Sequence, residues 1–247
     1  MSERGYADAS GLRTYWEAHG SGEPVLLLHG GFEHAGALPQ LTAALAASYR
    51  VIEPERRAHG RTPDAGGELH YEAMADDTLA FMNALGLARP RVVGFSDGAI
   101  VALLLALRRP DRCGRLVLVG ANYDASGLQP EFLRLVRETP PELLFPALVD
   151  AQRRLSPDGP EQYRAVFDRV RRLWSEEPHL EPAALARVAS PTLVLAGDAD
   201  AVRVEHTVAL FRALPDARLC IVPGGSHGVL TEHPELCASV ILEFLAE

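Results

Sequence analysis

The sequence contains no lysine: its 24 basic side chains are all arginines, set against 33 Asp and Glu in 247 residues. Without lysine there can be no Schiff base with pyridoxal phosphate and no phosphate-binding loop of the G-x-x-x-x-G-K type, because both use the lysine ammonium. The net charge of −9 is spread along the chain, whereas a nucleic-acid-binding protein carries a basic stripe. We therefore expect neither of these cofactor chemistries, and no nucleic acid as a partner.

Long uncharged apolar runs are also missing. Residues 1–5 lack the charged start and apolar run of a secretion signal, and the longest apolar stretch, residues 98–107, is about half the ~20 residues of a membrane span. Cysteine is scarce, and Cys113, Cys220 and Cys237 are odd in number and lack metal-ligand spacing. We expect a cytoplasmic protein with reduced thiols and no membrane partner.

Short apolar runs alternate with helical patterns along most of the chain. The runs predict strands at residues 25–28, 50–54, 91–95, 116–120, 192–196 and 219–222. Between them the spacing predicts helices at residues 36–48, 71–85 and 99–107. Apolar strands separated by helices indicate an α/β fold, with a mostly parallel sheet and helices on both faces.

One region breaks this alternation. Residues 122–189 show no strand pattern but several amphipathic helical pieces separated by prolines. An all-helical insertion in a parallel-sheet protein is well placed to cover the carboxyl edge of the sheet, where ligands bind. The alternative is a surface excursion that only packs against the core. We expect residues 1–121 and 190–247 to form the core and residues 122–189 a helical cap.

A G-x-S-x-G motif at residues 94–98 stands directly between a predicted strand and a predicted helix. Its glycines allow a tight, strained turn that raises the hydroxyl of Ser96 above the sheet. The amide of Asp97 would then lie at a helix N-terminus, where its N–H and the helix dipole can stabilise an oxyanion. In this context the motif predicts a nucleophilic Ser96.

A serine nucleophile needs a base that is oriented by a carboxylate. His227 is the candidate base, because a glycine-rich loop presents it after the last predicted strand. Asp198 and Asp200 compete as the acid just past another strand. The position within Gly197-x-x-Asp200 favours Asp200, whereas Asp198 is suited to bracing the turn through backbone amides.

Taken in order, these motifs resemble those of the α/β-hydrolase superfamily from about residue 25 to residue 234. They are His29-Gly30-Gly31, Arg57-x-His59-Gly60-Arg61-Thr62, the Ser96 turn, Gly197-x-x-Asp200, and Gly224-x-Ser226-His227 followed by Glu232-His233-Pro234. The resemblance implies a helical cap inserted after the sixth strand. It also implies an oxyanion hole in which the amide of Gly31 joins that of Asp97.

The sequence departs from the family pattern at two places. Ala58 stands where a glycine often occupies a tight turn, and Val204 stands where a proline is usual. Neither position belongs to the candidate catalytic residues. Epoxide hydrolases and haloalkane dehalogenases of the superfamily use an aspartate nucleophile, so Ser96 in that place argues against both reactions.

Within the superfamily, Ser96-Asp97-Gly98 and residues 116–122 resemble valacyclovir hydrolase and related esterases of α-amino-acid esters. In that group the aspartate after the nucleophile receives the substrate's ammonium, a role that would fall on Asp97. A buried carboxylate costs several kcal/mol unless it is paired, and a chain without lysine must pair it with arginine, water or ligand. The alternative is that Asp97 pairs with a nearby arginine or with Asn122, or stays hydrated.

These observations together predict a cofactor-free serine hydrolase that cleaves a small-molecule ester through an acyl-enzyme. No metal is expected, since the nine histidines show neither H-E-x-x-H nor paired ligand spacing. The same three residues, Ser96, His227 and Asp200, could as a catalytic triad cleave a thioester, lactone, amide or carbon–carbon bond. They could also support the perhydrolysis known from haloperoxidases of the family. A non-catalytic ligand receptor is an alternative of another class. The sequence carries no indication of oligomeric state.

Overall fold

A computed structural model describes residues 2–247, which build one eight-stranded sheet. The strands are β1 (Ser2–Ala9), β2 (Leu12–Gly20), β3 (Pro24–Leu28), β4 (Arg50–Pro54), β5 (Arg91–Phe95), β6 (Leu116–Val119), β7 (Thr192–Ala199) and β8 (Ala217–Ser226). They lie in the order β1-β2-β4-β3-β5-β6-β7-β8, with β1 and β2 antiparallel to their neighbours and the other pairs parallel. The predicted α/β fold with a mostly parallel sheet is therefore confirmed.

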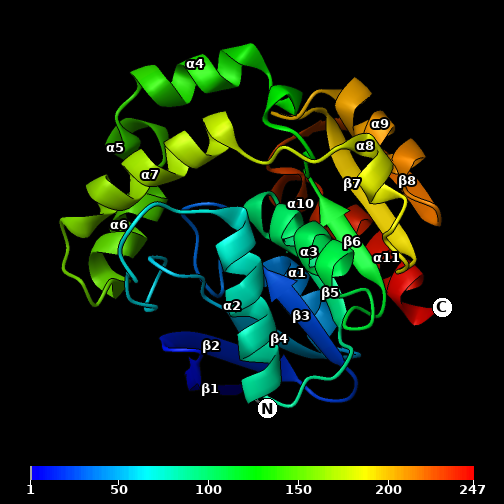
Figure 1. Ribbon diagram of the computed structural model, residues 1–247, viewed down its shortest axis with the longest axis horizontal. Coiled ribbons are helices and arrows are strands. Elements are labelled where there is room, and N and C mark those ends of the chain that lie inside the picture. Colours follow the sequence, from blue (N-terminus) through cyan, green and yellow to red (C-terminus); the bar gives the residue numbers. More distant parts are fainter. Residues whose placement is uncertain (1) are drawn as a thin grey trace.

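Helices cover both faces of the sheet, as Figure 1 shows. Those that pack on it are α1 (Pro39–Ala46), α2 (Tyr71–Ala84), α3 (Asp97–Arg108), α9 (Val204–Ala213), α10 (Val229–Glu232) and α11 (Pro234–Ala246). Helices α2 and α3 lie side by side on the near face, while α1 and α11 pack together behind the sheet.

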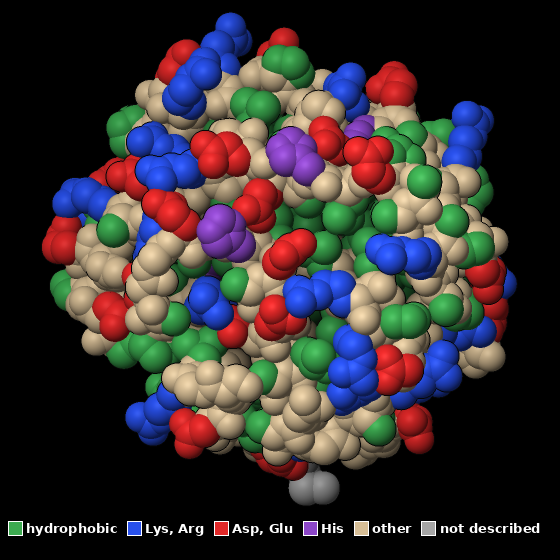
Figure 2. Space-filling view, viewed as in Figure 1, with side chains coloured by type: hydrophobic (Ala, Val, Ile, Leu, Met, Phe, Trp, Pro, Cys, Tyr) green, Lys and Arg blue, Asp and Glu red, His purple; other side chains and the backbone are tan. Residues whose placement is uncertain are grey.

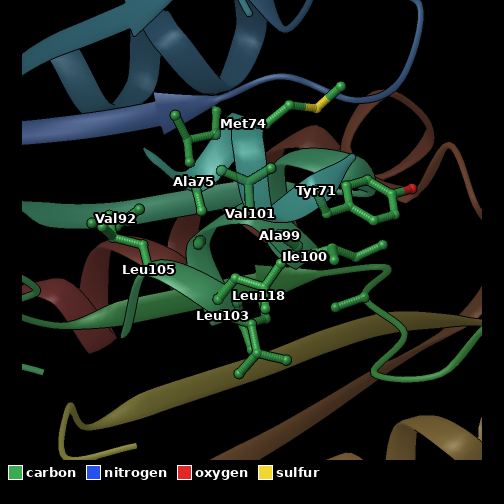
Figure 3. Close-up of a cluster of buried hydrophobic side chains, with 14 of the residues drawn as sticks. Tyr71, Met74, Ala75, Val92, Ala99, Ile100, Val101, Leu103, Leu105 and Leu118 are labelled. Atoms are coloured by element: carbon green, nitrogen blue, oxygen red, sulfur yellow. The ribbon is translucent and has the colours of Figure 1, made fainter. Parts of the chain in front are cut away.

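The central strands are apolar along their whole length because both of their faces are buried. Val25 and Leu27 of β3 belong to the hydrophobic cluster on the α1 and α11 side, and Leu26 and Leu28 to the cluster on the other side. Figure 3 shows this second cluster, in which Tyr71, Met74 and Ala75 of α2 lie near the residues of α3 and the sheet. Two buried faces give the sheet a rigid carboxyl edge on which a site can be built.

The N-terminal strands β1 and β2 lie before the first strand that the sequence predicts. They form a hairpin around Ser10 and Gly11, both with positive φ, of 52° and 87°. Strand β1 is at the edge of the sheet and most of its side chains are exposed, so it lacks the apolar run that marks the central strands. Strands β7 and β8 are longer than predicted, because their pairing continues past Gly197 through an irregular register.

The order of the strands creates a crevice above β3 and β5. From β3 the chain moves outward to β4, then crosses back to place β5 on the other side of β3. In open α/β sheets, ligands bind outside the carboxyl ends of the strands at such a reversal. The loops that follow β3 and β5 carry His29 and Ser96, so two of the predicted motifs meet at this point.

Between β6 and β7 the regular elements are all helices, joined by loops and turns. This helical insertion, residues 122–189, contains a short 3-10 turn (Ala125–Gly127) and helices α4 (Pro130–Glu138), α5 (Pro141–Leu144), α6 (Pro146–Leu155), α7 (Gln162–Glu176) and α8 (Pro182–Leu185). Helices α4 to α7 lie above the sheet in Figure 1, while α8 has returned to the side of α9. The buried Gln152 side chain ties α6 to the core by accepting from the amide of Gly60 and donating to the carbonyl of Ala58, both at 2.8 Å.

The surface carries charges of both signs. On the face shown in Figure 2, arginines are interspersed with Asp and Glu and no patch of one sign dominates. Several arginines of α7 are paired, for example Arg169 with Asp64 and Arg172 with Glu68.

Of the helices within residues 2–247, none combines the length and hydropathy that crossing a bilayer requires.

Candidate active site

Ser96 lies on a tight turn between β5 and α3. Its backbone has φ of 52° and ψ of −120°, a conformation that costs a non-glycine residue roughly 1–3 kcal/mol. The flanking glycines make the turn possible, because a Cβ on Gly94 would lie 2.4 Å from the carbonyl oxygen of Gly98 and one on Gly98 2.2 Å from that of Leu28. Strain at a single serine held between two obligatory glycines indicates a position built to present the hydroxyl.

The structure brings Ser96, His227 and Asp200 together in one hydrogen-bonded chain, although they are far apart in sequence. The Oγ of Ser96 lies 2.9 Å from Nε2 of His227, and Nδ1 of the same ring lies 2.6 Å from Oδ1 of Asp200. Because the carboxylate can only accept, Nδ1 carries the proton and Nε2 is free to accept the serine proton. This is the arrangement that a general base needs.

Of the two competing acids, Asp200 is the one that reaches the histidine. Its side chain is buried and also accepts the amide of Val202 at 3.0 Å, which fixes the carboxylate. Asp198 instead accepts the amide of Gly224 at 2.8 Å and braces the loop that leads to His227. The two carboxylates therefore have separate positions and separate partners.

The charges around the hydrogen-bonded series Ser96–His227–Asp200 favour a basic imidazole. Burial lowers the pKa of His227, but the hydrogen bond and negative charge of Asp200 raise it more, so the pKa lies above its usual value. Gly120, with φ of 61°, leaves room for the ring, since a Cβ there would lie 3.0 Å from Cε1 of His227. Sequence reasoning missed Gly120, because only the folded structure places it against the histidine.

The two predicted oxyanion donors, Gly31 and Asp97, lie beside each other at Ser96. A Cβ on Gly31 would come within 2.5 Å of the Asp97 side chain, so this approach requires glycine. Asp97 is the first residue of α3, where backbone N–H groups lack helical partners. Within residues 2–247 we find no hydrogen-bond acceptor for either amide. Both are available to a ligand.

The Asp97 side chain is buried and has partners that the sequence did not indicate. Its Oδ1 accepts from the hydroxyl of Tyr71 at 3.0 Å and from Nε1 of Trp174 at 2.8 Å, while its Oδ2 is buried without a partner. Burial raises the pKa of the Asp97 carboxyl, and the nearby charge of Arg56 opposes that rise. Asn122 is directed elsewhere and donates to the carbonyl of Asp124.

A cavity of about 320 Å³ opens above Ser96. The core contributes one side of it, and the helical insertion contributes the other through Leu128, Phe132, Phe145, Leu148 and Trp174. Glu33, Asp97 and Glu177 also line the cavity, and His227 is the basic side chain among the lining residues. The site is thus a largely apolar chamber that is lined by the hydroxyl-bearing Ser96 and by acidic groups.

The two departures from the family pattern have local consequences only. Ala58 adopts φ of 64°, the left-handed conformation that a glycine accepts more readily. Val204 begins helix α9 without the proline. Neither residue lines the cavity.

Known proteins resemble this chain over nearly its whole length. The model of the alpha/beta hydrolase family matches residues 25–240. A RutD protein of Agrobacterium fabrum, provisionally named a carbamate hydrolase, is 31% identical over 94% of this chain and 97% of its own. The 2-hydroxymuconate semialdehyde hydrolase of Pseudomonas sp. strain CF600 is 27% identical over 97% of this chain and 92% of its own.

Among solved structures, the CarC enzyme, a serine hydrolase involved in carbazole degradation, superposes with a TM-score of 0.81. It is 25% identical, and the alignment covers 100% of this chain and 99% of that one. The family match spans far more than half of the chain, and it contains the turn at Ser96 as well as Asp200 and His227. This chain therefore belongs to the alpha/beta hydrolase family.

Proposed function

We propose that this member of the family is a serine hydrolase that cleaves small carboxylic esters through an acyl-enzyme, without a cofactor. The observation that carries the proposal is the continuous chain from the hydroxyl of Ser96 through His227 to the buried Asp200, at the floor of the cavity. Its likeness over the full length to a protein named a serine hydrolase supports the same chemistry.

In the first half of the reaction, Ser96 attacks the ester carbonyl while His227 takes the hydroxyl proton. The carbonyl oxygen becomes negatively charged, and the amides of Gly31 and Asp97 donate to it. Asp200 holds the imidazole in the required tautomer and stabilises its transient positive charge. His227 then gives the proton to the departing alcohol, and the acyl group remains on Ser96.

In the second half, a water molecule replaces the alcohol. His227 removes a proton from that water, which attacks the acyl carbonyl through a second tetrahedral intermediate. Collapse of this intermediate releases the carboxylic acid and returns the proton to Ser96. The proton leaves Ser96 and returns to it over the 2.9 Å contact between the serine oxygen and Nε2 of His227, and the same nitrogen serves the alcohol and the water in between.

We propose that the helical insertion is a cap. Its aromatic and aliphatic side chains face Ser96 across the cavity, so they would exclude bulk water and bound the acyl or alcohol group. A dry chamber strengthens the hydrogen bonds that the oxyanion receives. The cap role for residues 122–189 therefore fits with the acyl-enzyme chemistry assigned to the core.

The narrower substrate class that we propose is α-amino-acid esters. Three acidic residues line the cavity and no arginine does so within residues 2–247, so an ammonium group would find complementary charge there. Oδ2 of Asp97 is buried without a partner, which is costly for a carboxylate and would be relieved by a bound cation. Neither an arginine nor Asn122 binds this oxygen.

A panel of substrates tests the proposal. Purified wild-type protein and Ser96→Ala are assayed on matched aminoacyl, acyl and thio esters, on lactones, on carbamates and on a vinylogous 1,5-diketone whose carbon–carbon bond is cleaved. We expect the highest kcat/KM on an ester and no turnover by Ser96→Ala. If a carbamate or a carbon–carbon bond is cleaved preferentially, the ester assignment is wrong and the substrate class is instead that of a named relative. No turnover of any substrate by folded wild type would favour a receptor.

A further inference from the structure

Arg56 is a buried cation without an ion-pair partner. It is 4% exposed, and among residues 2–247 its guanidinium forms no ion pair with a carboxylate. Its neighbour Arg57 is bound to Asp77 at 2.6 and 2.8 Å and is half-buried at the surface. Burying a guanidinium without a counter-ion is expensive, so the arrangement requires compensating hydrogen bonds.

Those hydrogen bonds all lead to the loop that follows β3. Nη1 of Arg56 donates to the carbonyl of His29 and Nη2 donates to the carbonyl of Gly30 at 2.7 Å, while Nε is buried without a partner within residues 2–247. The backbone amide of Arg56 donates to Nε2 of His29 at 3.2 Å. That bond leaves the ring proton on Nδ1, which lies 2.8 Å from the carbonyl oxygen of Gly30. Arg56 thus holds this loop with both its side chain and its backbone.

The carbonyl of Gly30 belongs to the same peptide group as the amide of Gly31. This oxygen accepts from Arg56 and His29, and from the amide of Glu33 at 3.3 Å. Several donors on one carbonyl fix the plane of the peptide, and so fix the direction of its N–H. A charged donor is roughly twice as strong as a neutral one, and hydrogen bonds in series polarise one another. The N–H of Gly31 becomes a better donor as a result.

We propose that Arg56 is a positioning residue for the reaction: it orients and polarises the Gly30–Gly31 peptide so that the Gly31 amide stabilises the oxyanion. The inference rests on the proposed function, because it concerns the same tetrahedral intermediate. The guanidinium lies outside the set of residues that line the cavity, so it acts through the peptide and not by touching the substrate.

A competing interpretation is that Arg56 only balances the charges of Asp97 and Glu33. Burial lowers the pKa of Arg56, and these two carboxyl groups oppose that shift. The two interpretations differ in what they predict for neutral ligands. Charge balance affects ligands that carry an ammonium, whereas oxyanion stabilisation affects the tetrahedral state of any ester. Plain acyl esters and a trifluoromethyl ketone, which forms a tetrahedral adduct with a serine nucleophile, therefore separate them.

The experiment compares wild type with Arg56→Gln and Arg56→Lys on a plain acyl ester. The matched control is Arg112→Gln, since Arg112 also donates to two consecutive carbonyls, those of Leu87 and Ala88, but on a loop outside the site. We expect Arg56→Gln to lower kcat about 10- to 100-fold, part of the loss seen when an oxyanion donor is removed outright. KM should change little, and Ki for the trifluoromethyl ketone should rise by the factor by which kcat falls.

Arg56→Lys keeps the charge and one donor nitrogen, so it should recover part of kcat. It also keeps the test usable if Arg56→Gln does not fold. Folded Arg56 variants with wild-type kcat and Ki would overturn the inference, as would a change in KM alone. Equal losses in Arg112→Gln would reduce the role to loop stability. Failure of the proposed function looks different, because wild type itself would then neither turn over esters nor form the ketone adduct.

Discussion

The core and the helical insertion contribute different things to the same cavity. The candidate catalytic residues stand on short loops at the ends of β3, β5, β7 and β8, held by a sheet that is buried on both faces. The opposite wall is built from apolar side chains of α4, α6 and α7, without any of the candidate catalytic residues. Under the proposed function, the groups that break the bond all lie in the core, whereas the insertion supplies the apolar surface that would bound the substrate.

Asp97 is where the two regions meet. Its amide belongs to the core, at the start of α3, whereas its carboxylate is held by Trp174 from the insertion and by Tyr71 from the core. The same residue is therefore a proposed oxyanion donor through its backbone and a proposed ammonium site through its side chain. Substitutions that alter only the side chain separate the two roles.

The largest loss of activity is expected from a substitution in the core, where Asp200 and Asp198 are predicted to differ. Asp200→Asn should lower kcat about 10⁴-fold, because an amide at this position favours the wrong tautomer of His227. Asp198→Asn, on the same loop, should stay within about threefold of wild type because Asp198 only braces a turn. Steady-state kinetics on one ester measures both, and similar losses in the two variants would contradict the assignment of the acid.

The next effect tests Asp97 at the boundary. Asp97→Asn keeps the acceptor for Tyr71 and Trp174 but removes the negative charge. We expect kcat/KM to fall roughly 30-fold or more for α-amino-acid esters, as when one partner of a buried charge pair is removed, and by less than about threefold for plain acyl esters. Paired assays with matched acyl groups measure the ratio. Equal losses on both substrates would remove the ammonium site from the account.

A pH profile probes the base directly. His227 must be neutral to accept the serine proton, and its pKa is raised above the usual value, so it is protonated and inactive at low pH. The kcat/KM of wild type should therefore rise with pH through a pKa above about 6.5, falling about tenfold for each unit below it. If the acidic side of the kcat/KM profile instead gave a pKa well below 6.5, a group other than His227 would control the reaction.

The smallest effect is expected in the insertion. Leu148→Ala removes apolar contact in the cavity wall and should raise KM about 3- to 10-fold with little change in kcat. Leu148 is only partly buried, so the loss is equivalent to about one or two buried methylenes, roughly 0.7–1.4 kcal/mol. The matched control is Leu143→Ala, because Leu143 is 76% exposed on the same insertion. A large loss of kcat in Leu148→Ala would mean that the insertion takes part in the chemistry.

Much of this arrangement could be predicted from short sequence patterns. The central strands are buried on both faces, so their apolar runs are continuous, and the turn at Ser96 has glycines at fixed spacing. The order of the motifs also indicated His227. Strand β1 was missed because it is mostly exposed at the edge of the sheet, and β2 because polar and charged residues interrupt its apolar ones.

The partners of the site residues could not be predicted in the same way. Tyr71 and Trp174 reach Asp97 from 26 and 77 residues away, and Arg56 reaches the His29 loop from 27 residues away. In the sequence, Tyr71 and Trp174 are indistinguishable from other apolar residues of amphipathic helices, and Arg56 is one of several arginines in a loop. Only the packing of α2, α7 and the loop after β4 around the turn gives these side chains their roles.

The central claim is that Ser96 is an activated nucleophile, and labelling with a fluorophosphonate tests it most directly. Wild type and Ser96→Ala, both shown to be folded by circular dichroism, are treated with the probe, and the modified peptide is identified by mass spectrometry. We predict one adduct on Ser96 of wild type and none on Ser96→Ala. A folded wild type that stays unlabelled, or a Ser96→Ala protein labelled to the same extent, would contradict the account.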